Sequence, residues 1–182
     1  MNQAWDRRGL VLAVALALGM VVTRVGHFGE FNGPPDASWA VFFLGGLWLR
    51  DLRVFPAFFV LAWFADLLAF ALGTPTNCYS IAYLALIPAY GALWWAGRAV
   101  AERGITPIRI VLFGAGSALV TFTIANLGMF GWATPVSTPT LATFVPAVAG
   151  YFPGYLLTMS LYVGAALVIE QALRWSVSIR AS

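Results

Sequence analysis

The segment at 73–80, GTPTNCYS, contains Cys78, the only cysteine in the 182-residue chain. A lone thiol cannot form an internal disulfide, and dithiol redox chemistry is excluded because it needs a pair of cysteines. As a thiolate, Cys78 can attack an electrophile or bind a soft or borderline metal ion. One thiolate holds a metal weakly, so a metal bound here would arrive already chelated, as in a corrin or a porphyrin. The alternative interpretation is a small apolar filler.

A carboxylate is expected at the same level as Cys78. Asp66 lies inside a long apolar run, WFADLLAF, where a charged group is costly and is therefore a candidate for function. The alternative is a structural carboxylate, held by an ion pair or a hydrogen bond. Its possible partners are Arg24, Asn126, Tyr83 and Tyr151.

Further candidates come from the ring-bearing side chains. His27 is the only histidine, and it directly follows the first apolar run, so it either faces a ligand or is a solvated loop residue. Tyr83 follows Cys78 closely enough to point toward the same cavity, and Tyr151 belongs to a set of aromatic residues expected at the same end. A belt of aromatic side chains at the membrane interface is the alternative account of the tyrosines.

The composition indicates that transmembrane helices position these residues. Hydrophobic residues make up 61% of the chain and charged residues 9%, far from the balance of a soluble domain. We therefore expect an all-α integral membrane protein in which residues 1–182 form a single transmembrane domain. A spanning helix takes ~20 residues, so no room remains for a soluble domain.

Six apolar segments are predicted to span the membrane, forming a bundle of six transmembrane helices. The second is short for a span, and the sixth is too long for one straight helix, with Pro146, Gly150, Pro153 and Gly154 as places where it can bend or begin. The segments are 9–25, 38–49, 54–72, 80–97, 108–130 and 141–173.

The arginines predict the orientation. If the N-terminus is cytoplasmic, Arg24 is the only arginine near the outside, which is the asymmetry of the positive-inside rule. Both termini are then cytoplasmic, and Cys78 faces the outside. The arginines expected inside are Arg7, Arg8, Arg50, Arg53, Arg98, Arg103, Arg109, Arg174 and Arg180.

Several kinds of chemistry are excluded. The chain has no lysine, so it has no phosphate-binding loop ending in Gly-Lys-Ser/Thr, and any ATP-driven step must come from a partner. A single histidine excludes a bis-histidine haem site within one chain and a His-rich zinc site. No nucleic-acid partner is expected, because no basic cluster is interleaved with exposed aromatic residues. In the first span, Ala13 and Ala17 have the small-x-x-x-small spacing that lets another helix approach closely.

Taken together, these residues resemble a known family. The six spans, the Ala-x-x-x-Ala first helix, the segment HFGEFNGPPDASWAVFFLGGLWLRD, the intramembrane aspartate in WFADLLAF and the loop TPTNCYSIAY are similar to the BtuM family. Its members are the cobalamin-specific substrate-binding S-components of energy-coupling factor (ECF) transporters in the bacterial inner (cytoplasmic) membrane. The resemblance covers nearly the whole chain and implies an S-component-like bundle.

The resemblance assigns roles to the candidates. It implies that cobalamin binds in a cavity open to the outside, with Cys78 as an axial ligand of the corrin cobalt and the benzimidazole base displaced. It places His27, Asp66 and Tyr83 around that cavity, and Tyr151 falls among the rim aromatics that would cover the ring. It also implies removal of the cyano group from cyanocobalamin, with Cys78 as the reacting residue.

The resemblance also implies partners. Besides cobalamin and the lipid bilayer, these are an ECF transmembrane coupling subunit, on which the face of Ala13 and Ala17 docks, and the two ATPases joined to it. Two alternatives stay open. One is a small membrane thiol enzyme that uses Cys78 as a covalent nucleophile and His27 as base. The sequence offers no third group to orient His27, which counts against this alternative. The other is an assembly subunit in which Cys78 is incidental.

Overall fold

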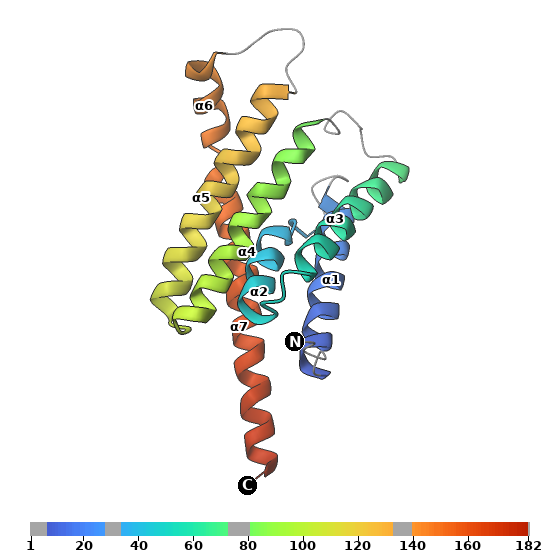
Figure 1. Cartoon of the computed structure of the whole chain (residues 1–182), viewed down its shortest axis with the longest axis vertical. Coiled ribbons are helices and arrows are strands. Elements are labelled where there is room, and N and C mark those ends of the chain that lie inside the picture. Colours follow the sequence, from blue (N-terminus) through green and yellow to red (C-terminus); the bar gives the residue numbers. More distant parts are fainter. Residues whose placement is uncertain (1–6, 28–33, 73–80, 133–139, 182) are drawn as a thin grey trace.

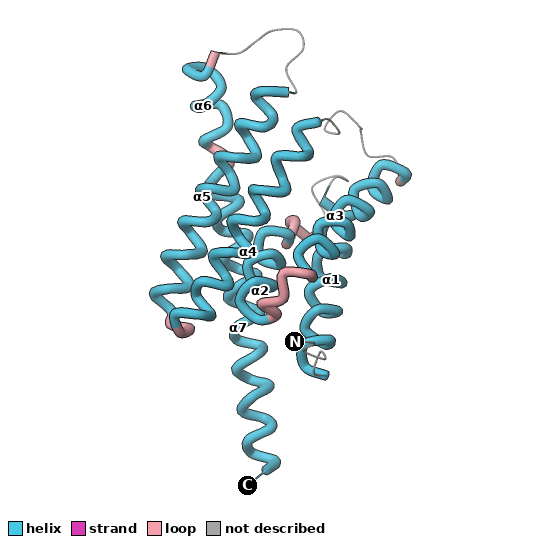
Figure 2. Tube along the Cα trace, in the orientation of Figure 1, coloured by secondary structure: helices cyan, strands magenta, loops and turns pink. Residues whose placement is uncertain are grey.

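The computed structural model of the chain describes residues 7–27, 34–72, 81–132 and 140–181. Over these residues the protein is a bundle of helices and contains no strand (Figures 1 and 2). The prediction of an all-α fold is confirmed. The elements are α1 (Arg7–His27), α2 (Ser38–Trp48), α3 (Val54–Ala71), the 3-10 helix η2 (Ile81–Ala85), α4 (Leu86–Arg103), α5 (Pro107–Trp132), α6 (Leu141–Ala149) and α7 (Phe152–Ala181).

The helices follow the six predicted segments, with two differences. The fourth segment begins as the 3-10 helix η2 and continues as α4. The sixth is divided into α6 and α7 at Gly150 and Tyr151, within the stretch whose prolines and glycines predicted a bend. Pro146 lies inside α6, and Pro153 lies in the first turn of α7, where its missing N–H has no helical partner to lose.

Three helices of the described part are long and apolar enough to cross a membrane. They are the stretches Val54–Ala71, Pro107–Gly131 and Leu141–Ser176. The other predicted spans are shorter or bear charge: α2 has only 11 residues, and α4 carries Arg98, Glu102 and Arg103 in its last turns. By length and composition, the described helices that suit a membrane span are therefore α3, α5 and the α6–α7 stretch.

The short helix α2 is the centre of the bundle. At 1.5 Å per residue it is only ~16 Å long, about half the thickness of a bilayer core. It is apolar on every side and contacts α1, α3, α4 and α7; Figure 1 shows it between α4 and α3. Phe42 stacks on Tyr90 of α4 with ring centroids 4.4 Å apart and meets Phe58 of α3 edge to face. Its buried residues are Ser38, Ala40, Val41, Phe42, Phe43, Leu44, Gly45, Gly46 and Leu47.

Glycines bring α2 and α4 into backbone contact. A Cβ atom on Gly97 of α4 would collide with the carbonyl oxygen of Phe43, and one on Gly46 of α2 would collide with the carbonyl oxygen of Trp94. Only glycine allows this approach, because any side chain would force the two helices apart. The side chain of Trp94 is fully buried beside this crossing.

Two tight turns close the end of the bundle at which α1 begins and α7 ends (Figure 1). Gly104, after α4, adopts a φ of 91°, and Arg50, after α2, adopts a φ of 57°, a left-handed conformation that is uncommon for a side-chain-bearing residue. Arg109 donates a 2.9 Å hydrogen bond to the carbonyl of Gly104, and Asp51 accepts the N–H of Arg53 at 3.0 Å. These bonds fix both turns.

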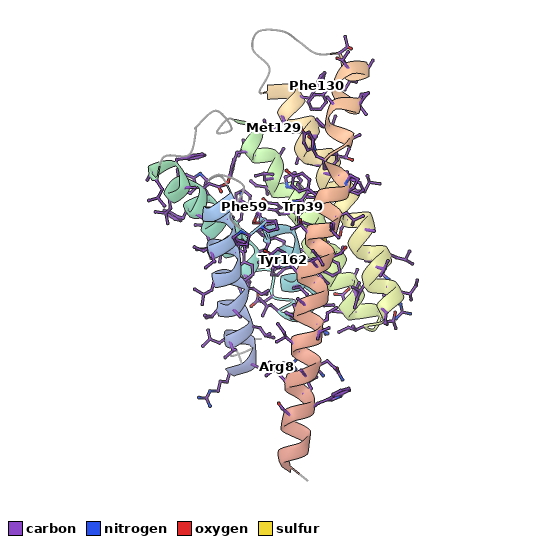
Figure 3. The ribbon with its side chains drawn as sticks, turned by 180° about the vertical axis from the view of Figure 1, so that it is seen from behind. Arg8, Trp39, Phe59, Met129, Phe130 and Tyr162 are labelled. Carbon is purple, nitrogen blue, oxygen red and sulfur yellow. The ribbon has the colours of Figure 1, made fainter. Side chains whose placement is uncertain are left out.

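Most arginines gather toward one end of the bundle. Every arginine except Arg24 lies at the start of α1, in the two tight turns, in the adjoining ends of α4 and α5, or in the last third of α7. Arg24 lies near the other end of α1. In Figure 3, Arg8 lies toward the first end and Met129 toward the opposite one.

Candidate functional site

A recess opens at the end of the bundle opposite the arginine-rich turns. It has a volume of about 290 Å³ and draws residues from α1, α2, α3, η2, α4, α5 and α7, together with two residues that adjoin α2 and α7. A second recess of about 240 Å³ adjoins it and shares Asp36, Trp39, Tyr151 and Tyr155. The first is lined by Arg24, Asp36, Trp39, Asp66, Tyr83, Leu86, Tyr90, Phe122, Ala125, Asn126, Met129, Tyr151 and Tyr155.

Arg24 and Asp66 form a buried ion pair at the base of the recess. Arg24 donates from Nε to Asp66 Oδ1 at 2.6 Å and from Nη2 to Asp66 Oδ2 at 2.8 Å, the paired geometry in which a guanidinium binds a carboxylate best. The same Nη2 donates to the hydroxyl of Tyr83 at 3.1 Å. This pair joins α1 to α3 and to η2.

The remaining nitrogen of Arg24 faces the beginning of α2. Nη1 lies 2.8 Å from Ser38 Oγ, 3.0 Å from the hydroxyl of Tyr90 and 3.1 Å from Asp36 Oδ2. Asp36 also accepts the backbone N–H and the hydroxyl of Ser38 on Oδ1, at 2.9 and 2.6 Å, and so pairs the first N–H group of α2. One arginine thereby holds two carboxylates.

The walls of the recess are aromatic. Trp39 of α2 stacks on Tyr155 of α7 with ring centroids 5.0 Å apart and planes 20° apart, and Phe122 of α5 meets Tyr155 at 6.0 Å. Tyr162, about two turns further along α7, donates a 2.8 Å hydrogen bond to the carbonyl of Pro35. Figure 3 shows Trp39 beside α7, with Tyr162 below it. These contacts attach α7 to the start of α2.

The structure brings together some of the residues predicted from the sequence. Asp66 and Tyr83 both contact Arg24 and both line the recess, and Tyr151 lines it from the junction of α6 and α7. The predicted ion pair between Asp66 and Arg24 is present in the structure. His27 is the last residue of α1, and its side chain is not described. Cys78 lies outside the described residues, so its role stays a prediction.

Sequence reasoning did not single out Asp36, Tyr90 or Tyr155, and it named Trp39 only as part of an aromatic belt at the membrane interface. These residues reach the recess only through contacts between distant parts of the chain. One signal was present: Arg24 is the single arginine on the predicted outer side, and a lone buried cation requires carboxylates around it. Asp36, which follows two prolines directly before α2, is one of the acidic residues close to Arg24 in the sequence.

The role of the small residues of α1 as a docking surface for a partner stays a prediction. Ala13 and Ala17 are both half-buried, and Ala17 packs against the core of this same chain. The more exposed side of α1 carries Leu10, Val11, Val14, Leu18 and Val22.

Among the described residues, no three His, Cys, Asp or Glu side chains are placed to hold a metal ion together. Arg24 has used its donors on the protein, so the recess presents carboxylate oxygens, tyrosine hydroxyls that can donate or accept, and aromatic faces. The side-chain amide nitrogen of Asn126 donates one of its two N–H groups to the carbonyl of Phe122, at 2.8 Å. No protein-family model matches the sequence, and no curated protein is significantly similar to it.

Proposed function

We propose that this chain is a membrane-embedded cobalamin-binding component that takes up cobalamin, with the corrin cobalt coordinated by the thiolate of Cys78. The observation that carries the proposal is the recess at one end of an apolar helical bundle, built by almost every helix and walled by Trp39, Tyr155 and Phe122. Ligand sites combine apolar and aromatic walls with a few polar groups in this way.

The position of Cys78 in the chain agrees with this proposal. It lies in the sequence between the end of α3 and the start of η2, and the residues on both sides of that gap, Asp66 and Tyr83, line the recess. A corrin supplies four equatorial nitrogens to the cobalt and leaves its axial positions open, so a single thiolate from the protein is enough to coordinate the metal. No cluster of protein ligands is then needed.

The size of the recess limits which part of the ligand it meets. A cobalamin is larger than the recesses of about 290 and 240 Å³ together, so the described residues contact one side of it. The aromatic walls cover apolar ring surface, while Asp36 and Asn126 provide acceptors for the amide groups around the ring.

The same arrangement supports removal of cyanide. A thiolate donates electron density to Co(III) and weakens the bond on the opposite face, so the cobalt–carbon bond breaks and cyanide leaves with its electron pair. The protein has only to present the sulfur and keep the other face open. Binding and decyanation then share Cys78.

We further propose a bacterial inner-membrane location with both termini in the cytoplasm. The concentration of arginines at one end of the bundle and the apolar length of α3, α5 and the α6–α7 stretch support this orientation. Energy for transport would come from an ECF coupling subunit with its two ATPases, docked on the face of Ala13 and Ala17.

The absorption spectrum of the purified full-length protein with cyanocobalamin tests the proposal. Wild type is expected to bind the ligand and to change its visible spectrum as the axial ligands are exchanged, whereas Cys78→Ala is expected to leave the spectrum of free cyanocobalamin. Ser80→Ala, in the same stretch of sequence, is the matched control and should behave as wild type. An unchanged spectrum in all three proteins removes the cobalt-ligand role.

The thiol-enzyme alternative makes the opposite prediction. It requires a covalent adduct on Cys78 visible by intact mass after exposure to a substrate, with no bound chromophore. A red ligand that remains with wild-type protein through gel filtration counts against it.

A further inference from the structure

We infer that Asp36 is the ligand-facing carboxylate of the recess and that it selects a ligand offering N–H donors over one carrying an anionic group. This inference rests on the proposed function, because it names the part of a corrinoid that the site reads: the amide side chains at the rim of the ring. Neither the composition nor the predicted spans indicated a role for Asp36.

The first step is that Arg24 has no donor left for a ligand. A guanidinium has five N–H groups. Arg24 makes six contacts of 3.1 Å or less with five groups of the protein: Nε and Nη2 meet Asp66 and Tyr83, and the two N–H groups of Nη1 are shared among Asp36, Ser38 and Tyr90. The side chain of Arg24 is 6% exposed. Among the residues that the structure describes, Arg24 is the only cation that lines the recess. All of its N–H groups are therefore used by other groups of the protein.

The second step is the sign of the charge. Asp36 and Asp66 together carry two formal negative charges against the single positive charge of Arg24, so this cluster has a formal charge of −1. Inside a helical bundle such a charge is weakly screened, and a second anion placed beside it is repelled. The cluster therefore disfavours ligands with a carboxylate at this position.

The third step distinguishes the two carboxylates. Asp66 uses both oxygens on Arg24 and is 1% exposed, whereas Asp36 is 21% exposed and lines both adjoining recesses. Oδ2 of Asp36 receives one long bond from Arg24, at 3.1 Å, and a carboxylate oxygen has two lone pairs. Asp36 has both the exposure and the acceptor capacity to meet a ligand.

The fourth step is the ligand group that fits. Asp36 lies next to the stacked rings of Trp39 and Tyr155, so an N–H donor reaching it emerges from an apolar surface covered by those rings. A corrin ring bearing primary amides has this form. Hydrolysis of one amide to a carboxylate changes almost nothing in shape but replaces a donor with an anion.

Equilibrium binding of the full-length protein in detergent to cyanocobalamin, and to its separated monocarboxylate isomers, tests the inference. Wild type is expected to bind at least one monocarboxylate about tenfold or more weaker than the parent amide. Asp36→Asn is expected to reduce that ratio to within about threefold, because the like charge is removed while an acceptor for the Ser38 N–H is kept. Asp51→Asn, at the opposite end of the bundle, is the matched control and should keep the wild-type ratio.

A second variant covers the possibility that Asp36→Asn does not fold. Asp36→Glu retains the charge and should retain the discrimination. The inference is overturned if wild type binds amide and monocarboxylate equally, if Asp36→Asn discriminates as wild type does, or if Asp36→Glu loses the discrimination. Those outcomes leave cobalamin binding itself intact. If wild type binds none of these corrinoids, the proposed function fails and the inference falls with it.

Discussion

Arg24 binds Asp66 through two parallel hydrogen bonds of 2.6 and 2.8 Å, although 42 positions separate them in the sequence. The two side chains are 6% and 1% exposed. Removing two charges from solvent is costly, and the cost is offset only while both partners are present and hydrogen-bonded. The stability of the bundle at this end therefore depends on the pair being intact.

Asp66→Ala is expected to destabilise the protein by about 3–5 kcal/mol, because it leaves the Arg24 guanidinium buried with half of its countercharge removed. The measurement is reversible unfolding in mixed micelles. The double variant Arg24→Met with Asp66→Leu should recover part of the loss, because it removes the buried pair but also deprives Asp36 of its ion pair with Arg24. If Asp66→Ala unfolds as wild type does, the pair is not the support described above.

Glu170→Gln provides the exposed counterpart. Glu170 binds Arg8 of α1 and Arg174 of α7, whose side chains are 57% and 59% exposed. Exposed ion pairs contribute little, so the loss should be below about 1 kcal/mol and should shrink as salt is added. A loss as large as that of Asp66→Ala would show that α1 and α7 are joined more strongly than these contacts indicate.

Gly97→Ala should weaken the packing of α4 on α2. The new Cβ would collide with the carbonyl oxygen of Phe43, and overpacking of this kind costs about 1–3 kcal/mol or more. Gly116→Ala on α5 is the control, because nothing lies within 4 Å of the added atom. Thermal unfolding of both variants in the same detergent decides the matter, and equal midpoints would contradict close backbone contact.

Trp39 and Tyr155 should be energetically coupled. Their stacked rings, with centroids 5.0 Å apart, are the main aromatic contact between α2 and α7, and such pairs are worth about 0.5–1.5 kcal/mol beyond their buried area. A double-mutant cycle with Trp39→Ala and Tyr155→Ala measures that coupling. Strictly additive losses would mean that α7 is attached by other contacts.

The sequence was sufficient for most of the helices, because long apolar runs interrupted by Gly, Pro and Asn leave little choice of structure. It was also sufficient to name Arg24 as a partner for Asp66. The position of α2 at the centre of the bundle was harder to predict from the sequence. An apolar segment of 11 residues is typical of a short span, and only its contacts with α4 distinguish a span from a central buried helix.

The lining of the recess was predicted only in part. Asp66 and Tyr83 stood out as polar groups within apolar runs. Asp36 lies in a polar-looking stretch before α2 and Trp39 in the first turn of α2, and their place at the recess follows only from their contacts with Arg24 and Tyr155. Contacts between positions so far apart depend on how helices pack, which local patterns do not specify. The composition of a segment therefore located the helices better than it located the site.

The central place of α2 has a consequence for how the chain is assembled. Residues 38–48 leave the ribosome before α4 exists, yet α4 supplies the surface against which the glycines of α2 pack. A helix of ~16 Å cannot cross the bilayer alone, and hydrocarbon offers its ends no hydrogen-bonding partners. We expect the insertion machinery to retain α2 until α3 and α4 have been made, and nascent chains ending before Leu86 to remain crosslinkable to that machinery.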